Sequence, residues 1–339
     1  MGPVAKKVTE FKDKFYVAAL AFNEDGTQLA ANFMVGDDGV QVWAWRDPSH
    51  IIHTLVKQAD AGDGHALSYS PDGNFLAVRH GISDDGRVVR VWNAHTGEVV
   101  HDLVEHEGQG VAGGMGFSPD GKLLMLTISR GIHQAGDQLF VYRTDTWELA
   151  WAVRTMPFQP TVVATSPDGK LIALGGQEVY GLGTPPKPKI LVMDIVTRQI
   201  ARTIDAPFLG GIPVTTLAWR PDGLYIAAGC SPGDNSPDPD VVRIFEVGTG
   251  KRIASVAAKY GTVTGLTYSP DGRYLIAGSV DDSVRIMDGH NYTLLQKIPG
   301  DARSVGVSRD SRYLAISAFP SISVWELKRT GAGVAGLTE

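Results

Sequence analysis

The sequence predicts an all-β fold in which seven blades of four antiparallel strands form a closed ring. Three observations carry this prediction. A motif built on Pro-Asp-Gly recurs along almost the whole chain, apolar and polar residues alternate beside each copy, and no long stretch has helical periodicity. Five copies contain Pro-Asp-Gly, and two degenerate copies, NEDG at 23–26 and SRDS at 308–311, flank them. Their aspartates are separated by 47, 48, 48, 54, 49 and 39 residues: Asp25, Asp72, Asp120, Asp168, Asp222, Asp271 and Asp310. A four-stranded unit repeated in this way is typical of a β-propeller.

The first two strands of each unit flank the Pro-Asp-Gly turn. Segments such as 17–22 (VAALAF) and 263–268 (VTGLTY) alternate with period two, which indicates a half-buried strand. Proline presets the backbone of the turn, and glycine tolerates a left-handed conformation at its end. An apolar second strand follows, as in 75–78 (FLAV) and 171–174 (LIAL).

The third and fourth strands complete each unit. The third ends in an aromatic residue or Met, and a polar turn such as Thr-Gly-Glu leads to the fourth. We therefore expect one propeller domain followed by a flexible tail at 329–339. Its blades are expected at about 14–57, 60–104, 110–154, 159–205, 212–257, 261–299 and 302–328, the last completed by 3–11.

The two ends of the chain predict how the ring closes. The last unit has only three strands and stops after 321–328, while a strand-like segment at 3–11 has no partner in the first unit. Pairing the two segments completes blade seven and removes two free edges. We therefore expect deletion of residues 1–11 to destabilise the protein strongly.

Composition limits the function classes. The chain has 339 residues and a formal net charge of −6, which argues against nucleic-acid binding because that requires a basic surface. Its one cysteine, Cys230, excludes an intramolecular disulfide and a multi-cysteine metal site. No apolar run approaches the ~18 residues of a membrane span, and the start of the chain lacks the apolar core of a secretory signal. We expect a soluble, cytoplasmic monomer that does not bind membranes.

The repeats resemble those of the WD-repeat propeller family. The SPDG turns and the Val91-Trp92 and Val324-Trp325 pairs carry the resemblance, which covers residues 3–328. The family's Trp-Asp pair is replaced here, for example by Trp92-Asn93, and Gly64-His65 is the only clear Gly-His pair near a blade entry. Two segments also resemble YVTN-type propellers, which suggests a prokaryotic source. The resemblance implies a binding platform without catalysis.

Loop lengths single out one face as the candidate binding surface. The long connections between second and third strands belong to blades three to five: 129–138, 175–189 and 229–240. They lie on one face because each joins the same pair of strands, and loops on a rigid frame commonly carry function. Arginine, aromatic and histidine side chains there and in blade two are the candidate partner contacts, since Arg and aromatic residues dominate interface hot spots: Arg79, His80, Arg130, His133, Phe158, Tyr180 and Phe208.

Other interpretations of these residues stay open. Phe158 and Phe208 can instead pack beneath their own loops, and 184–189 (TPPKPK) can be a stiff solvated loop rather than a polyproline ligand. The G-x-S-x-G match at 229–233 lacks the helix that a nucleophile elbow requires. We expect no catalytic group, metal or cofactor. A propeller enzyme with a ligand or metal in the central channel is the alternative to a protein-binding scaffold.

Overall fold

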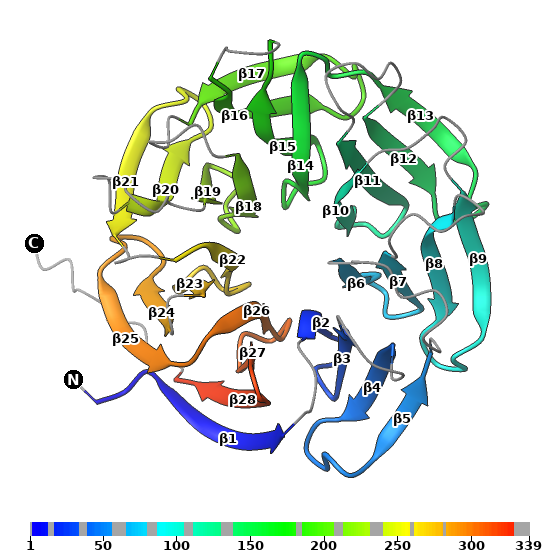
Figure 1. Ribbon diagram of the computed structural model, residues 1–339, viewed down its shortest axis with the longest axis vertical. Coiled ribbons are helices and arrows are strands. Elements are labelled where there is room, and N and C mark those ends of the chain that lie inside the picture. The colour runs from blue at the N-terminus through cyan, green and yellow to red at the C-terminus, as the bar shows by residue number, and fades with distance from the viewer. Residues whose placement is uncertain are drawn as a thin grey trace, which may run out of the picture.

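The computed structural model describes residues 2–12, 17–33, 39–55, 66–79, 87–104, 111–129, 138–180, 185–206, 213–230, 240–257, 261–280 and 283–328. These residues form 28 strands in seven four-stranded antiparallel sheets around a central axis, so the predicted propeller is confirmed (Figure 1). The described residues contain no helix long and apolar enough to cross a membrane.

Each blade is a meander whose first strand lies nearest the axis. Blade one contains β2 (Val17–Phe22), β3 (Gln28–Phe33), β4 (Val40–Ala44) and β5 (Ile51–Thr54). Blade two contains β6 (Leu67–Tyr69), β7 (Phe75–Arg79), β8 (Arg87–Asn93) and β9 (Val99–Val104). Blade three contains β10 (Val111–Phe117), β11 (Leu123–Ser129), β12 (Leu139–Arg143) and β13 (Leu149–Val153). Blade four contains β14 (Phe158–Thr165), β15 (Leu171–Glu178), β16 (Lys187–Asp194) and β17 (Ile200–Asp205).

The remaining blades repeat this order until the ring closes. Blade five contains β18 (Val214–Trp219), β19 (Tyr225–Cys230), β20 (Asp240–Glu246) and β21 (Arg252–Ala257). Blade six contains β22 (Val263–Tyr268), β23 (Tyr274–Ser279), β24 (Ser283–Asp288) and β25 (Leu294–Pro299). Blade seven contains β26 (Ala302–Val307), β27 (Tyr313–Ala318) and β28 (Ser321–Leu327), with β1 (Ala5–Lys12) as its outer strand.

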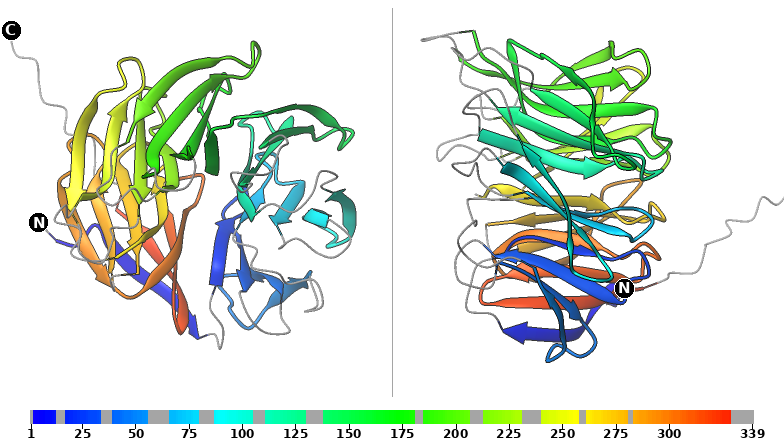
Figure 2. Two further views of the ribbon diagram at one scale, coloured as in Figure 1. Left: turned by 45° about the horizontal axis from the view of Figure 1, so that its top comes forward. Right: turned by 90° about the vertical axis from the view of Figure 1, so that its right-hand side faces the viewer.

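The strands run between the two faces of the ring (Figure 2). Because each blade is an antiparallel meander, the first-to-second and third-to-fourth connections share one face, here called the turn face. The second-to-third connections and the crossings between blades share the other, here called the loop face. Of the candidate contacts predicted from the sequence, the described ones, Arg79, Phe158 and Tyr180, lie at or just beyond the loop-face ends of their strands.

A serine two residues before the turn aspartate holds the turn together in most blades. In five blades its Oγ donates to the turn aspartate at 2.5 to 2.7 Å and accepts the backbone N–H five residues on at 2.9 to 3.0 Å. Blade five has Arg220 in place of serine, and its guanidinium forms an ion pair with Asp222 instead. The turn glycines have positive φ, for example +72° at Gly121, where residues with a side chain are strained.

Two β-bulges recur in the blades and shape the ring. One interrupts the pairing of third and fourth strands just before the aromatic residue or Met, for example between Val91 and Trp92. The other interrupts the pairing of first and second strands, as between Val214 and Thr216, so that Thr215 has no partner across the ladder. Because a bulge frees one residue from its ladder and turns the strand locally, the inner bulge directs that residue away from its own sheet.

Apolar side chains from neighbouring blades fill the wedges between them. One cluster joins β3 and β4 of blade one to β27 and β28 of blade seven, with Trp43, Trp45 and Tyr313 among its members. The Trp45 and Tyr313 rings lie 4.8 Å apart, and the guanidinium of Arg46 lies 4.2 Å from the Trp45 ring. Burial of these large side chains across the seam stabilises the blade seven–blade one contact.

Ring closure by the N-terminal strand is confirmed. β1 pairs with β28 from Ala5–Leu327 to Lys12–Ser321, and the N–H of Lys328 donates to the carbonyl of Val4 at 2.8 Å. The side-chain amide of Gln296, on the outer strand of blade six, also holds Ala5. Its Oε1 accepts the Ala5 N–H at 2.8 Å and its Nε2 donates to the Ala5 carbonyl at 3.1 Å.

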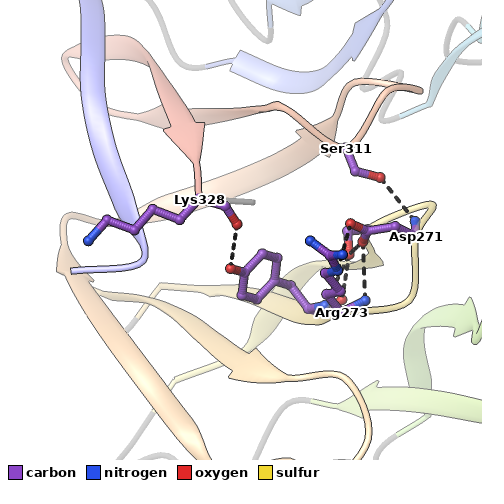
Figure 3. A network of polar contacts seen from close by, with 6 residues as sticks. Asp271, Arg273, Ser311 and Lys328 are labelled. Atoms are coloured by element: carbon purple, nitrogen blue, oxygen red, sulfur yellow. Dashed lines mark hydrogen bonds and ion pairs between the residues drawn. The ribbon is translucent and has the colours of Figure 1, made fainter. Parts of the chain in front are cut away.

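Hydrogen bonds on the turn face also join blades six and seven. The Tyr274 hydroxyl of β23 donates to the carbonyl of Lys328 at 2.9 Å, and the Asp271 N–H donates to Ser311 Oγ at 3.0 Å (Figure 3). Asp271 also accepts the N–H of Arg273 at 3.1 Å. The last blade is therefore fixed to its neighbour both by its outer strand and by its turn.

Candidate functional site

The first strands of the seven blades enclose a central cavity of about 560 Å³. Small and hydroxyl-bearing residues dominate its lining, and Arg303 of β26 is its one charged residue among the part of the chain that the structure describes. A cavity of this size can hold a small molecule. In the described ranges, no group of three or more His, Cys, Asp or Glu side chains is placed to hold a metal ion.

Three threonines on the cavity wall connect consecutive blades. Thr161, Thr215 and Thr264 are the extra residues of the inner bulges in blades four, five and six. Each hydroxyl donates to a carbonyl of the next blade: Thr161 to Val214, Thr215 to Val263 at 3.0 Å, and Thr264 to Ala302 at 2.8 Å. Their hydrogens are thereby used, so toward the cavity these hydroxyls offer only acceptor lone pairs. This half of the wall is rigid.

The structure separates the candidate contacts into buried and exposed residues. Arg79, at the end of β7, is 4% exposed, and Phe158, at the start of β14, is 2% exposed. Tyr180, in the connection after β15, is 54% exposed. His80, Arg130, His133 and Phe208 lie outside the described residues.

Phe158 packs into the core instead of presenting its ring to a partner. It belongs to a buried cluster that includes Met125, Leu139 and Leu174. Its N–H donates to the carbonyl of Thr155, whose Oγ1 donates to the carbonyl of Phe158 and to Gln138 Oε1 at 2.9 Å. The expectation that Phe158 contacts a partner is thus corrected to the packing alternative, because this connection folds inward under its own hydrogen bonds.

Tyr180 stands at the loop-face end of blade four within a polar cluster. Its hydroxyl donates to Glu178 Oε2 at 2.5 Å, and the Lys187 Nζ lies 5.6 Å from the centre of its ring. Glu178 also pairs with Lys189 at 2.9 Å, and Lys189 reaches Asp205 at 3.6 Å. β15 and β16 stay paired up to Glu178 and Lys187, so the cluster sits on a regular hairpin.

Hydrogen bonds within the cluster shift the pKa values of Tyr180 and Glu178. The bond to Glu178 raises the pKa of Tyr180. Partial burial works to raise the pKa of Glu178, but the hydrogen bonds from Tyr180 and Lys189 outweigh it and hold that pKa below its usual value. At neutral pH the cluster therefore contains an ionised glutamate and a protonated tyrosine, which fixes the ring while leaving it exposed.

Phe319 is an exposed aromatic residue on the loop face that the sequence analysis missed. It lies in the short connection between β27 and β28 and is 47% exposed. The sequence analysis concentrated on long loops, and this connection is one of the shortest. The signal that could have found it is an aromatic residue at the same point of the repeat as Tyr180, between the second and third strands.

Comparisons with known proteins agree on the repeat. The family model described as "WD domain, G-beta repeat" matches residues 250–288. Among curated proteins, the chain is similar to "Pre-mRNA-processing factor 19 homolog 2" of Arabidopsis thaliana, at 28% identity over 134 residues, which is 37% of this chain and 24% of that protein. It is also similar to "COMPASS component SWD3" of Saccharomyces cerevisiae, at 28% identity over 145 residues, which is 43% of this chain and 40% of that protein. The chain thus matches less than half the length of these relatives.

A solved structure supports the fold over nearly the whole chain. A chain of "Kuenenia stuttgartiensis Hydrazine Synthase" superposes with a TM-score of 0.75 at 20% sequence identity, covering 94% of this chain and 97% of that one. At this identity the likeness concerns the fold and not the chemistry.

Proposed function

We propose that this chain, a β-propeller in which residues 250–288 match the WD repeat model, acts as a non-catalytic scaffold that binds a partner protein or peptide on its loop face. The proposed surface is the rim of blades two to five. The observation that carries the proposal is Tyr180, an aromatic ring that is 54% exposed yet held in place by Glu178 and Lys187. Rigid exposed aromatic rings bury large area at little entropic cost and are enriched in interface hot spots.

Two further observations support a protein partner. Phe319, on blade seven and so outside the rim of blades two to five, is a second exposed aromatic residue on the same face, and a partner that spans the face contacts both. The yeast relative is by its name a component of a complex, and we extend that role, assembly with other proteins, to this chain.

The test is affinity capture from lysate of the source cells, read by mass spectrometry. We expect wild type to retain a specific protein that the Tyr180→Ala/Phe319→Ala double variant loses. Leu224→Ala is the matched control, since Leu224 is 57% exposed but lies beside the Pro-Asp-Gly turn on the opposite face. If the double variant captures the same protein as well as wild type does, the partner does not bind on the loop face as proposed.

The central cavity supports a second candidate, a propeller enzyme with a ligand in its channel. Its support is the volume of about 560 Å³ with a single charged lining residue, Arg303, among the residues described. The same capture experiment distinguishes the two candidates. A wild-type protein that recovers no protein but carries a co-purifying small molecule favours the channel candidate.

A further inference from the structure

Arg79 occupies a repeat position that is otherwise small or uncharged. The position lies in the second strand, seven residues after the turn aspartate; in blade two it pairs with Val89. The equivalent residues of the other blades are Asn32, Thr127, Gly175, Gly229, Gly278 and Ser317. Blade two alone carries a long, charged side chain there.

The glycines at this position show which way the side chain points. A Cβ added to Gly175 would lie 2.8 Å from Val214 Cγ1, and one added to Gly229 would lie 2.9 Å from Val263 Cγ1. Both valines belong to the first strand of the next blade. Arg79 therefore stands at the repeat position from which a side chain extends toward the next blade.

Arg79 lies beside the wall of the central cavity. Its N–H donates to the carbonyl of Ala66 at 3.0 Å, and Ala66 lines the cavity. The backbone of Arg79 is thus one hydrogen bond away from the cavity lining.

The charge of Arg79 has no counterpart among the residues that the structure describes. The side chain is 4% exposed, its Nε is buried without a hydrogen-bond partner, and no described carboxylate forms an ion pair with it. Burial lowers the pKa of Arg79 to about 9, so the guanidinium stays protonated at neutral pH. Arg90 in the same blade differs, because Asp102 binds it through both oxygens at 2.7 and 3.0 Å.

We propose that Arg79 is an anion-binding residue, which pairs with a carboxylate or phosphate group that a ligand brings to the loop-face end of blade two. An unpaired buried charge is strongly unfavourable, whereas an anion in the same desolvated place forms a strong, bidentate pair with a guanidinium. The inference rests on the proposed function insofar as the anionic group belongs to the bound partner, which would then be acidic at this point.

The test uses the purified full chain and thermal melts. The probes are inorganic phosphate and a hexaglutamate peptide, each compared with sodium chloride at matched ionic strength. At a tenfold excess of probe over Kd, we expect the wild-type Tm to rise by about 2 °C for a chain of this length. Arg79→Met should melt above wild type without probe, because the unpaired charge is gone, and should show no rise with either probe.

Arg90→Met is the matched control. It leaves Asp102 without its ion-pair partner, so this variant should melt below wild type. Its Tm should still rise when probe is added. A response to phosphate alone identifies a phosphate group as the ligand, and a response to hexaglutamate alone identifies an acidic segment.

Two results would overturn the inference. One is an Arg79→Met variant that melts below wild type, since the guanidinium would then be paired within the protein. The other is a wild-type chain that responds to neither probe. Neither result bears on Tyr180 and Phe319, whose role the capture experiment decides by itself.

Discussion

Gln296 offers a sharp test of how the ring is held closed. Its side-chain amide satisfies both the N–H and the carbonyl of Ala5, which point away from β28. Gln296→Ala removes both bonds, and Ala5 is 2% exposed, so water replaces them poorly. At about 1 kcal/mol for each bond, the substitution should cost about 2 kcal/mol of the free energy of unfolding.

The expected change in melting temperature follows from the size of the chain. An unfolding entropy of about 2.1 cal/mol/K per residue gives about 0.7 kcal/mol/K for 339 residues. A loss of about 2 kcal/mol then lowers Tm by about 3 °C, which differential scanning calorimetry resolves. Gln199→Ala is the control, because Gln199 is exposed in a turn and its substitution should shift Tm by less than about 1 °C.

A double-mutant cycle isolates the contact. Because Gln296 acts through β1, Gln296→Ala should have almost no effect in a chain that lacks residues 1–11, a deletion that is itself strongly destabilising. If that chain does not fold, amide hydrogen exchange replaces the cycle: Gln296→Ala should lower protection in the β1–β28 ladder and leave β10–β11 unchanged. A Tm equal to wild type, or equal loss of protection in both ladders, would refute the reasoning.

Two further predictions concern the turns. Trp147 and Arg198 have φ of 58° and 60° at a turn position where Gly97 and Gly250 stand in other blades. Arg198→Gly should therefore leave Tm equal to or up to about 1 °C above wild type. Trp147→Gly removes a buried ring 5.1 Å from Phe75 and should lower Tm by about 3–6 °C in the same melts. A clear fall in Tm for both variants, or a rise for both, would contradict this reasoning. The second concerns pH. The hydrogen bond from Ser166 holds the pKa of Asp168 below its usual value, so this stabilisation is complete above about pH 4 and is lost as the pH falls through the folded-state pKa. Between pH 5 and 2, the Tm of Ser166→Ala should fall by less than the Tm of wild type. Parallel curves of Tm against pH for the two proteins would refute the assignment.

Local chemistry explains why the fold could be predicted from the sequence. Pro-Asp-Gly specifies its turn through φ and side-chain bonds within five residues, and period-two alternation identifies the strands beside it. Closure was predictable because an unpaired segment at 3–11 matched a missing fourth strand, and the Ala5–Leu327 register confirms it.

The candidate site was less predictable because it depends on contacts between blades. Residue type singled out Tyr180, which the structure shows to be exposed, and its role as a contact stays a prediction. Residue type gave no warning that Phe158 packs inward, which follows from hydrogen bonds to Thr155. The inner bulges also escaped detection, since Thr161 and its equivalents differ from ordinary strand residues only in the pairing they lack.

The pairing of β1 with β28 has a consequence for the order of events during synthesis. Ala5 and Leu327 are joined in the ladder although nearly the whole chain separates them. At a translation rate of roughly 5–20 residues per second, β28 is synthesised about 15–60 s after β1. Until then the nascent chain carries β1 as an unpaired strand, beside blades that can already have formed from local hairpins. The interval before the ring closes is therefore the one in which this protein is most exposed to strand-to-strand aggregation and most in need of a chaperone.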